Sequence, residues 1–150
     1  MTRRPADRGD DGFAGGFEGL LFGLLLFVIG TLLIAFAWGV VDTKTATGEA
    51  ARQAARTYVE APDGPAAALG AAQAARAALA GYGRDPDRAR MALVSGRFAR
   101  CGRVTIAVTY PAPLVELPFF GALGQGVDVR SEHSELVDPF RSGLSGTASC

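Results

Sequence analysis

The stretch GLLFGLLLFVIGTLLIAFAWGVV, residues 19–41, determines how the rest of the chain can be interpreted. Its 23 residues carry no charge. As a helix rising about 1.5 Å per residue, the stretch would cross a hydrocarbon layer about 30 Å thick. It is longer than the apolar region of a secretory signal, about 7 to 15 residues, and it continues past the cleavage-like motif Ala35–Phe36–Ala37. We therefore predict a retained transmembrane helix from Gly19 to Val41.

The charges outside this helix argue against one class of function but do not set the orientation. The chain has 15 basic and 15 acidic residues, and after Val41 the balance is 12 to 11. Nucleic-acid binding needs a clustered positive field, so we expect no nucleic-acid partner. Arginines lie before the apolar run, in residues 1–18, and basic residues follow it in residues 44–56. The positive-inside rule therefore gives no preference.

Helical periodicity continues beyond the apolar run. Residues 42–61 contain no proline and one glycine, Gly48, which is the weakest point of the predicted helix. Small side chains recur on one face of it at Thr47, Ala51, Ala54, Ala55 and Tyr58. We predict one long helix, about 40 residues, that begins in lipid and continues in water.

A second helix is predicted after the proline-rich break at residues 61–65. Asp63 can cap this helix, and Pro65 suits its first turn. Its predicted apolar face consists of Ala68, Ala72, Ala75, Leu79 and Tyr82.

From Arg90 onward the pattern changes from helical to alternating. Alternation is clearest from Val104 to Tyr110, with weaker candidate strands at Met91–Phe98 and Val127–Val137. Three consecutive strands favour an antiparallel meander with a helix over its apolar face. We therefore predict an α+β domain at residues 42–141, followed by a flexible tail at residues 142–150.

Four segments of the chain carry a resemblance to a known family. They are Gly16–Phe17–Glu18, Glu49–Arg56, Cys101–Ile106 and His133–Arg141. In this order, with a glycine-rich leader-like segment at residues 1–18 and a strand-rich end, the chain resembles the TadE-like pseudopilins of tight-adherence (Tad) pili, a type IV pilin-like family.

The resemblance implies a minor pseudopilin or assembly component of a pilus. Its partners would be the membrane, other pilins or pseudopilins and the pilus assembly machinery, and its leader would be cut by a prepilin peptidase on the cytoplasmic side. Gly12 and Gly16 are the candidate processing sites, and they would leave Glu18 sixth or second in the mature chain, where the family has its glutamate fifth. The resemblance also implies a cell-membrane location, with the C-terminal domain outside the cytoplasm.

Glu18 is the most informative single residue, because a carboxylate at a lipid boundary is costly unless it reaches the headgroups or a positive partner. The family implies pairing with the new terminal amine of a neighbouring subunit. The alternative is a glutamate that serves only the first turn of its helix. Four small residues, Gly19, Gly23, Gly30 and Ala37, lie within about 40° of one another on the helix and form a small-residue stripe against which another helix could pack.

Two cysteines, Cys101 and Cys150, follow the apolar run. They form a disulfide if the compartment is oxidising, or they are two free thiols, with Cys150 on a loose tail or pairing with another chain. The only histidine, His133, is expected on the opposite strand face from Glu132, as a surface or edge-strand residue without a metal. The apolar loop 114–120 could dock a partner or the membrane, or cover the sheet.

No catalytic constellation is apparent in the sequence. There is no Gly-rich phosphate loop, no Gly-x-Ser-x-Gly elbow and no metal-ligand cluster, so we expect a structural subunit without cofactors and not an enzyme. The alternative is a membrane-anchored binding module or enzyme of the cell envelope. The 109 residues after Val41 leave such a protein little room for a deep pocket.

Overall fold

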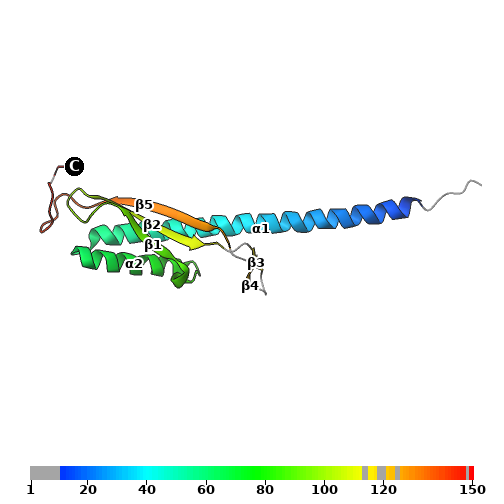
Figure 1. Ribbon diagram of the computed structural model, residues 1–150, viewed down its shortest axis with the longest axis horizontal. Coiled ribbons are helices and arrows are strands. Elements are labelled where there is room, and N and C mark those ends of the chain that lie inside the picture. The colour runs from blue at the N-terminus through cyan, green and yellow to red at the C-terminus, as the bar shows by residue number, and fades with distance from the viewer. Residues whose placement is uncertain (1–10, 113–114, 118–120, 124–125, 148) are drawn as a thin grey trace, which may run out of the picture. The chain divides into compact units, whose positions relative to one another are not determined.

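The computed structural model describes residues 11–112, 115–117, 121–123, 126–147 and 149–150 (Figure 1). The chain divides into two compact units, Met1–Ala35 and Phe36–Cys150. One helix, α1, spans Asp11–Glu60 and so contributes residues to both units.

The first unit, as far as it is described, is the N-terminal part of α1. α1 already includes residues 11–18, which precede Gly19, so the last residues of the predicted leader are helical. Residues 11–18 contain no proline to interrupt a helix. No described side chain from Phe17 to Ala35 is buried. By length and composition α1 is the one described helix that could cross a membrane, and an 18-residue window of it has a mean hydropathy of 2.8.

The second unit is an α+β domain, as the sequence predicted. The helices after α1 are α2 (Gly64–Gly81) and the short 3-10 helix η1 (Pro86–Arg88). The strands are β1 (Arg90–Ser95), β2 (Arg103–Pro111), β3 (Val115–Leu117), β4 (Gly121–Leu123) and β5 (Asp128–Leu136). The main sheet has the order β1-β2-β5 and is antiparallel throughout, which confirms the predicted meander.

The segment predicted as an apolar loop contains a strand. β3 pairs with β4 in a separate two-stranded antiparallel sheet. Strands of three residues are too short to show a period of two in the sequence, which explains the error. Leu114 and residues 118–120 of the predicted loop lie outside the described residues.

The two long helices cover one face of the main sheet (Figure 1). The predicted inner face of α1 is confirmed, since Thr47, Ala51, Ala54, Ala55 and Tyr58 are all buried.

The predicted face of α2 is wrong in its first half. Ala67 and Ala71 are buried there in place of Ala68 and Ala72, whereas Ala75 and Leu79 are buried as predicted. Tyr82 is partly exposed, at 43%. The start of the helix is as predicted, because Asp63 accepts a hydrogen bond from the backbone N–H of Ala66 at 2.8 Å.

Small side chains let the two helices lie close together. A Cβ added at Gly70 of α2 would lie 3.1 Å from Cγ2 of Thr57 on α1. The bulk of the core comes from the sheet, through Val104, Ile106 and Val108 of β2. The domain therefore consists of an alanine-rich helical layer packed on a layer of larger apolar side chains.

Candidate functional site

The apolar part of α1 presents an uncovered surface in the described chain. Glu18 is exposed, and a Cβ added at Gly19, Gly23 or Gly30 would meet nothing within 4 Å. Ala37, the fourth member of the small-residue stripe, is also exposed. These positions are therefore open to a partner helix. Gly12 and Gly16 lie within α1, in the part whose side chains are not described.

Polar contacts hold α1 against the sheet just beyond the apolar run. The Oγ1 of Thr47 lies 2.8 Å from the Oγ of Ser131 on β5, and both residues are buried. Nearby, Lys44 donates to the backbone carbonyl of Arg130. Arg84, which follows α2, forms a salt bridge with Asp42 of α1. The side chain of Arg84 is only 9% exposed. Sequence reasoning missed these long-range pairs, because nothing local in the sequence indicates partners so distant along the chain.

His133 lies at the edge of a shallow polar groove between α1 and β5. It is half-buried, and its Nε2 is 3.0 Å from Oε1 of Glu135. As predicted, it is on the opposite face of β5 from Glu132. The groove has a volume of about 490 Å³ and is lined from α1 by Lys44, Gly48 and Arg52. Among the described residues, no three His, Cys, Asp or Glu side chains are placed to hold a metal ion.

The solvent side of α1 carries the ion pairs that its sequence suggests. Arg52 lies 3.4 Å from Glu49, and Arg56 lies 3.0 Å from Glu60. The hydrogen bond and the negative charge of Glu60 raise the pKa of Arg56 above its usual value. Arg56 is fully exposed, so this pair contributes little to stability.

A cluster at the C-terminal end of α1 ties three chain segments together. Arg141 donates to the backbone carbonyls of Val59 at 2.7 Å and Glu60 at 3.2 Å, which are among the carbonyls that a helix end leaves unpaired. Its guanidinium lies 5.5 Å from the ring centre of Phe98, which in turn packs edge-on against Tyr58. Sequence reasoning did not single out Arg141.

The C-terminal segment is fastened to the turn between β1 and β2. Cys101 and Cys150 form a disulfide, which is one of the two alternatives that the sequence left open. The backbone N–H of Arg100 donates to the carbonyl of Ser145 at 2.9 Å. The predicted flexible tail is thus attached at two points, because Cys101 and Arg100 supply partners that periodicity cannot indicate.

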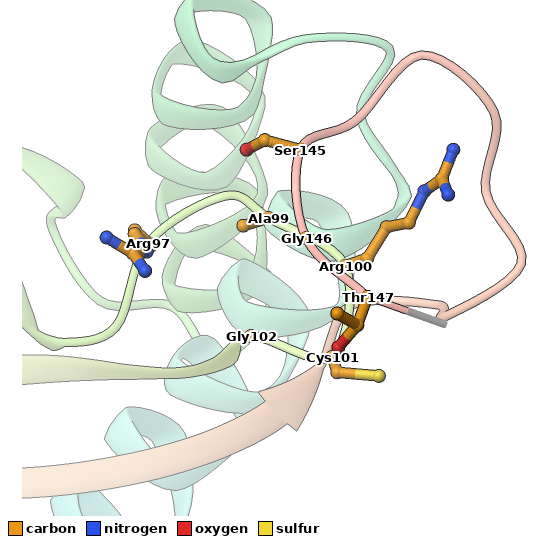
Figure 2. A pocket seen from close by; sticks show the side chains of 8 residues that line it. All are labelled: Arg97, Ala99, Arg100, Cys101, Gly102, Ser145, Gly146 and Thr147. Atoms are coloured by element: carbon orange, nitrogen blue, oxygen red, sulfur yellow. The ribbon is translucent and has the colours of Figure 1, made fainter. Parts of the chain in front are cut away.

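This turn depends on a glycine. Gly96 has a φ of +91°, and a Cβ there would lie 2.1 Å from the carbonyl oxygen of Arg103. Beside the turn is an open pocket of about 550 Å³ (Figure 2). Its lining combines turn residues with the tail, and consists of Arg97, Ala99, Arg100, Cys101, Gly102, Ser145, Gly146 and Thr147.

Comparisons of the whole chain with protein-family models, with curated proteins and with solved structures gave no match.

Proposed function

We propose that this protein is a membrane-anchored structural subunit, a minor pseudopilin or assembly component of a Tad or type IV-like pilus. It acts by packing its apolar helix against other helices and by presenting the α+β domain outside the cytoplasm. The cell membrane, other pilins or pseudopilins, the pilus assembly machinery and a prepilin peptidase are its proposed partners.

The observation that supports the proposal most is the contrast between the two parts of α1. From Phe17 to Val41 no described side chain is buried, whereas the inner face from Thr43 to Tyr58 is buried against α2 and the sheet. A run of exposed apolar residues such as Leu20 and Ile34 is costly in water, so it requires lipid or other helices around it. The same helix thus joins a segment that requires an apolar environment to a folded domain.

Glu18 and the small-residue stripe supply the proposed contacts. The stripe lets a partner helix approach the backbone closely, because glycine has no side chain to hold it away. The Glu18 carboxylate, at the boundary of the apolar run, would pair with the terminal amine of a neighbouring subunit. In a low-dielectric setting such a pair is much stronger than the same pair in water.

Replacing Glu18 by Gln tests the proposal, because this change keeps the shape and removes the charge. We expect normal membrane insertion and reduced incorporation into the assembly, since glutamine is easier to bury than glutamate. Recovery of the variant in membranes and in sheared filaments of the native host measures the two steps. Glu18→Asp, which retains the charge, should incorporate better than Glu18→Gln.

Glu49→Gln serves as the matched control, since Glu49 lies in the aqueous half of α1 and its described polar contacts are with Arg52 and Gln53 of the same helix. The alternative, a glutamate in the first turn of its helix, does not match the structure, because α1 already includes Asp11 and Glu18 lies beyond its first turn. Even in the first turn, the helix dipole would contribute about 0.3 to 1 kcal/mol, too little to abolish assembly. Incorporation of Glu18→Gln at the wild-type level would therefore contradict the pairing.

A further inference from the structure

The even charge balance of the chain conceals a local excess of arginine. Residues 96–103 and 139–147 together contain four arginines and no aspartate or glutamate. The rest of the chain therefore has 11 basic and 15 acidic residues (15 minus 4, against 15). These two segments meet at the turn between β1 and β2, where Arg100 is hydrogen-bonded to Ser145 and Cys101 is bonded to Cys150. The fold thus brings the positive segments together.

The open pocket of about 550 Å³ lies where these segments meet (Figure 2). Two arginines, Arg97 and Arg100, and two hydroxyl residues, Ser145 and Thr147, contribute to its lining, and no carboxylate side chain does. Arg97 is exposed, and no ion pair joins it to any described residue. In its contacts with the described residues, the guanidinium of Arg100 uses only Nε, which donates to the carbonyl of Arg141 at 2.7 Å. Donors for an anion therefore remain on both arginines.

The two guanidinium groups lie on opposite sides of the labelled cluster (Figure 2). A single small anion would not contact both, whereas a chain of linked anionic groups passing over the pocket would. Phosphate groups suit this set of donors, because guanidinium binds phosphate in a bidentate manner and further phosphate oxygens remain free to accept from hydroxyls.

The tail holds its half of the pocket in a fixed position. Gly146 packs so closely that a Cβ there would lie 3.0 Å from the carbonyl oxygen of Arg100. The disulfide fixes Cys150 three residues beyond Thr147. The hydroxyl residues of the lining are thus present beside the arginines only while the tail is attached.

We propose that this pocket binds a linear polymer of phosphate groups, and that the disulfide is required for binding. The inference does not depend on the proposed pilus function, since it concerns only the folded domain.

Fluorescence anisotropy with a labelled linear polyphosphate tests the proposal on the full-length chain in nanodiscs of phosphatidylcholine. The wild-type protein should bind, and Arg97→Gln should weaken binding about three- to tenfold at low salt, because one charge-assisted contact is lost. The side chain of Arg97 makes no described polar contact, and its backbone carbonyl, which accepts from Ala99, is kept in the variant, so the variant should remain folded; circular dichroism checks this. The matched control is Arg90→Gln, an exposed arginine at the start of β1, which should leave the affinity unchanged.

A Cys150→Ser variant provides a second, independent readout. We expect it to lose affinity to at least the extent of Arg97→Gln, because the tail then keeps only the hydrogen bond between Arg100 and Ser145 and its hydroxyl residues are held less firmly beside the arginines, while all four arginines remain. Equal losses in Arg97→Gln and Arg90→Gln would overturn the proposal, since binding would then follow total charge. Unchanged binding in Cys150→Ser would also overturn it. Poly-L-glutamate binding as tightly as polyphosphate would overturn the choice of phosphate.

Discussion

Arg141 illustrates how much a single residue can contribute to a small domain. The guanidinium of Arg141 donates to two backbone carbonyls at the end of α1 and lies over the ring of Phe98. The backbone carbonyl of Arg141 in turn accepts a hydrogen bond from the side chain of Arg100. Hydrogen bonds from a charged group contribute more than neutral ones, and the ring contact adds to them. Its side chain therefore links the C-terminal segment to the first helix.

We expect Arg141→Ala to destabilise the domain by about 1 to 3 kcal/mol, through the loss of these contacts. For a domain of this size the midpoint of thermal unfolding should fall by about 4 to 12 °C, measured by circular dichroism in a mild detergent. Arg90→Ala is the control, because Arg90 is exposed and no described ion pair involves it. A midpoint unchanged in both variants would contradict the role of Arg141.

The aqueous half of α1 contains one glycine that its surroundings do not require. A Cβ added at Gly48 would meet only the Oγ of Ser131, at 4.0 Å, which is an ordinary contact. Glycine within a helix costs about 0.5 to 1 kcal/mol relative to alanine. Gly70 of α2 differs, since its added Cβ would lie 3.1 Å from Thr57.

Gly48→Ala should therefore stabilise the domain by about 0.5 to 1 kcal/mol, whereas Gly70→Ala should gain less or be destabilising. Chemical denaturation monitored by circular dichroism compares the two. Equal stabilisation by both changes would show that the close approach of α1 and α2 at Gly70 does not constrain that position.

The small-residue stripe on the apolar part of α1 leads to a prediction about association. Replacing Gly23 or Gly30 by leucine should weaken co-purification with the partner helix, because the new side chain holds the two backbones apart. Gly39→Leu is the matched control, since Gly39 points about 160° to 200° away from the stripe and its added Cβ meets nothing within 4 Å. Association that is unchanged in both stripe variants would remove the stripe from the proposed interface.

The elements that the sequence predicted well are those with strong contrast between faces. Around Thr47 and Tyr58, small residues alternate with charged ones at helical spacing, and β2 alternates clearly between apolar and polar residues. In α2, alanines occur on every side, so hydrophobicity alone could not distinguish Ala67 from Ala68. Ala67 joins the buried core that α2 shares with α1 and the sheet, whereas Ala68 is exposed, and only the folded packing distinguishes them.

The candidate sites were less predictable, because their contacts join residues distant in the sequence. Arg141 is separated by 82 residues from the carbonyl to which it donates, and no local pattern indicates such a pair. The cysteines were visible as a pair of candidates, but their bond follows from the path of the tail. The small-residue stripe and Glu18 could be identified from the sequence, because they lie on one helix with a known period.

For the whole molecule, the position of the disulfide bears on orientation. Among the described residues no cysteine is free, and both members of the bond follow the apolar run. Disulfides persist in oxidising compartments and are rare in the cytosol. The disulfide therefore agrees with the location outside the cytoplasm that we propose for the domain.

We expect a membrane-impermeant thiol reagent to label intact cells only after treatment with an impermeant reductant. Before reduction both sulfurs are blocked, and after it both are accessible from outside. Broken, reduced cells give the maximum signal for comparison. Labelling that requires broken cells would place the domain in the cytoplasm and contradict the proposed orientation.

The disulfide also determines how the chain would carry a stretching force. A pull applied at Cys150 enters the fold directly at Cys101, beside the start of β2, and does not peel the tail and β5 away first. The segment between the two cysteines, with a separation of 49 positions, is shielded from the load. At 3.3 to 3.6 Å per residue, the fully extended chain with the disulfide intact would be about 160 to 180 Å shorter than the fully extended chain with the disulfide reduced. Under reducing conditions the same segment, which contains both β2 and β5, would carry the load and could be unfolded and extended by the force.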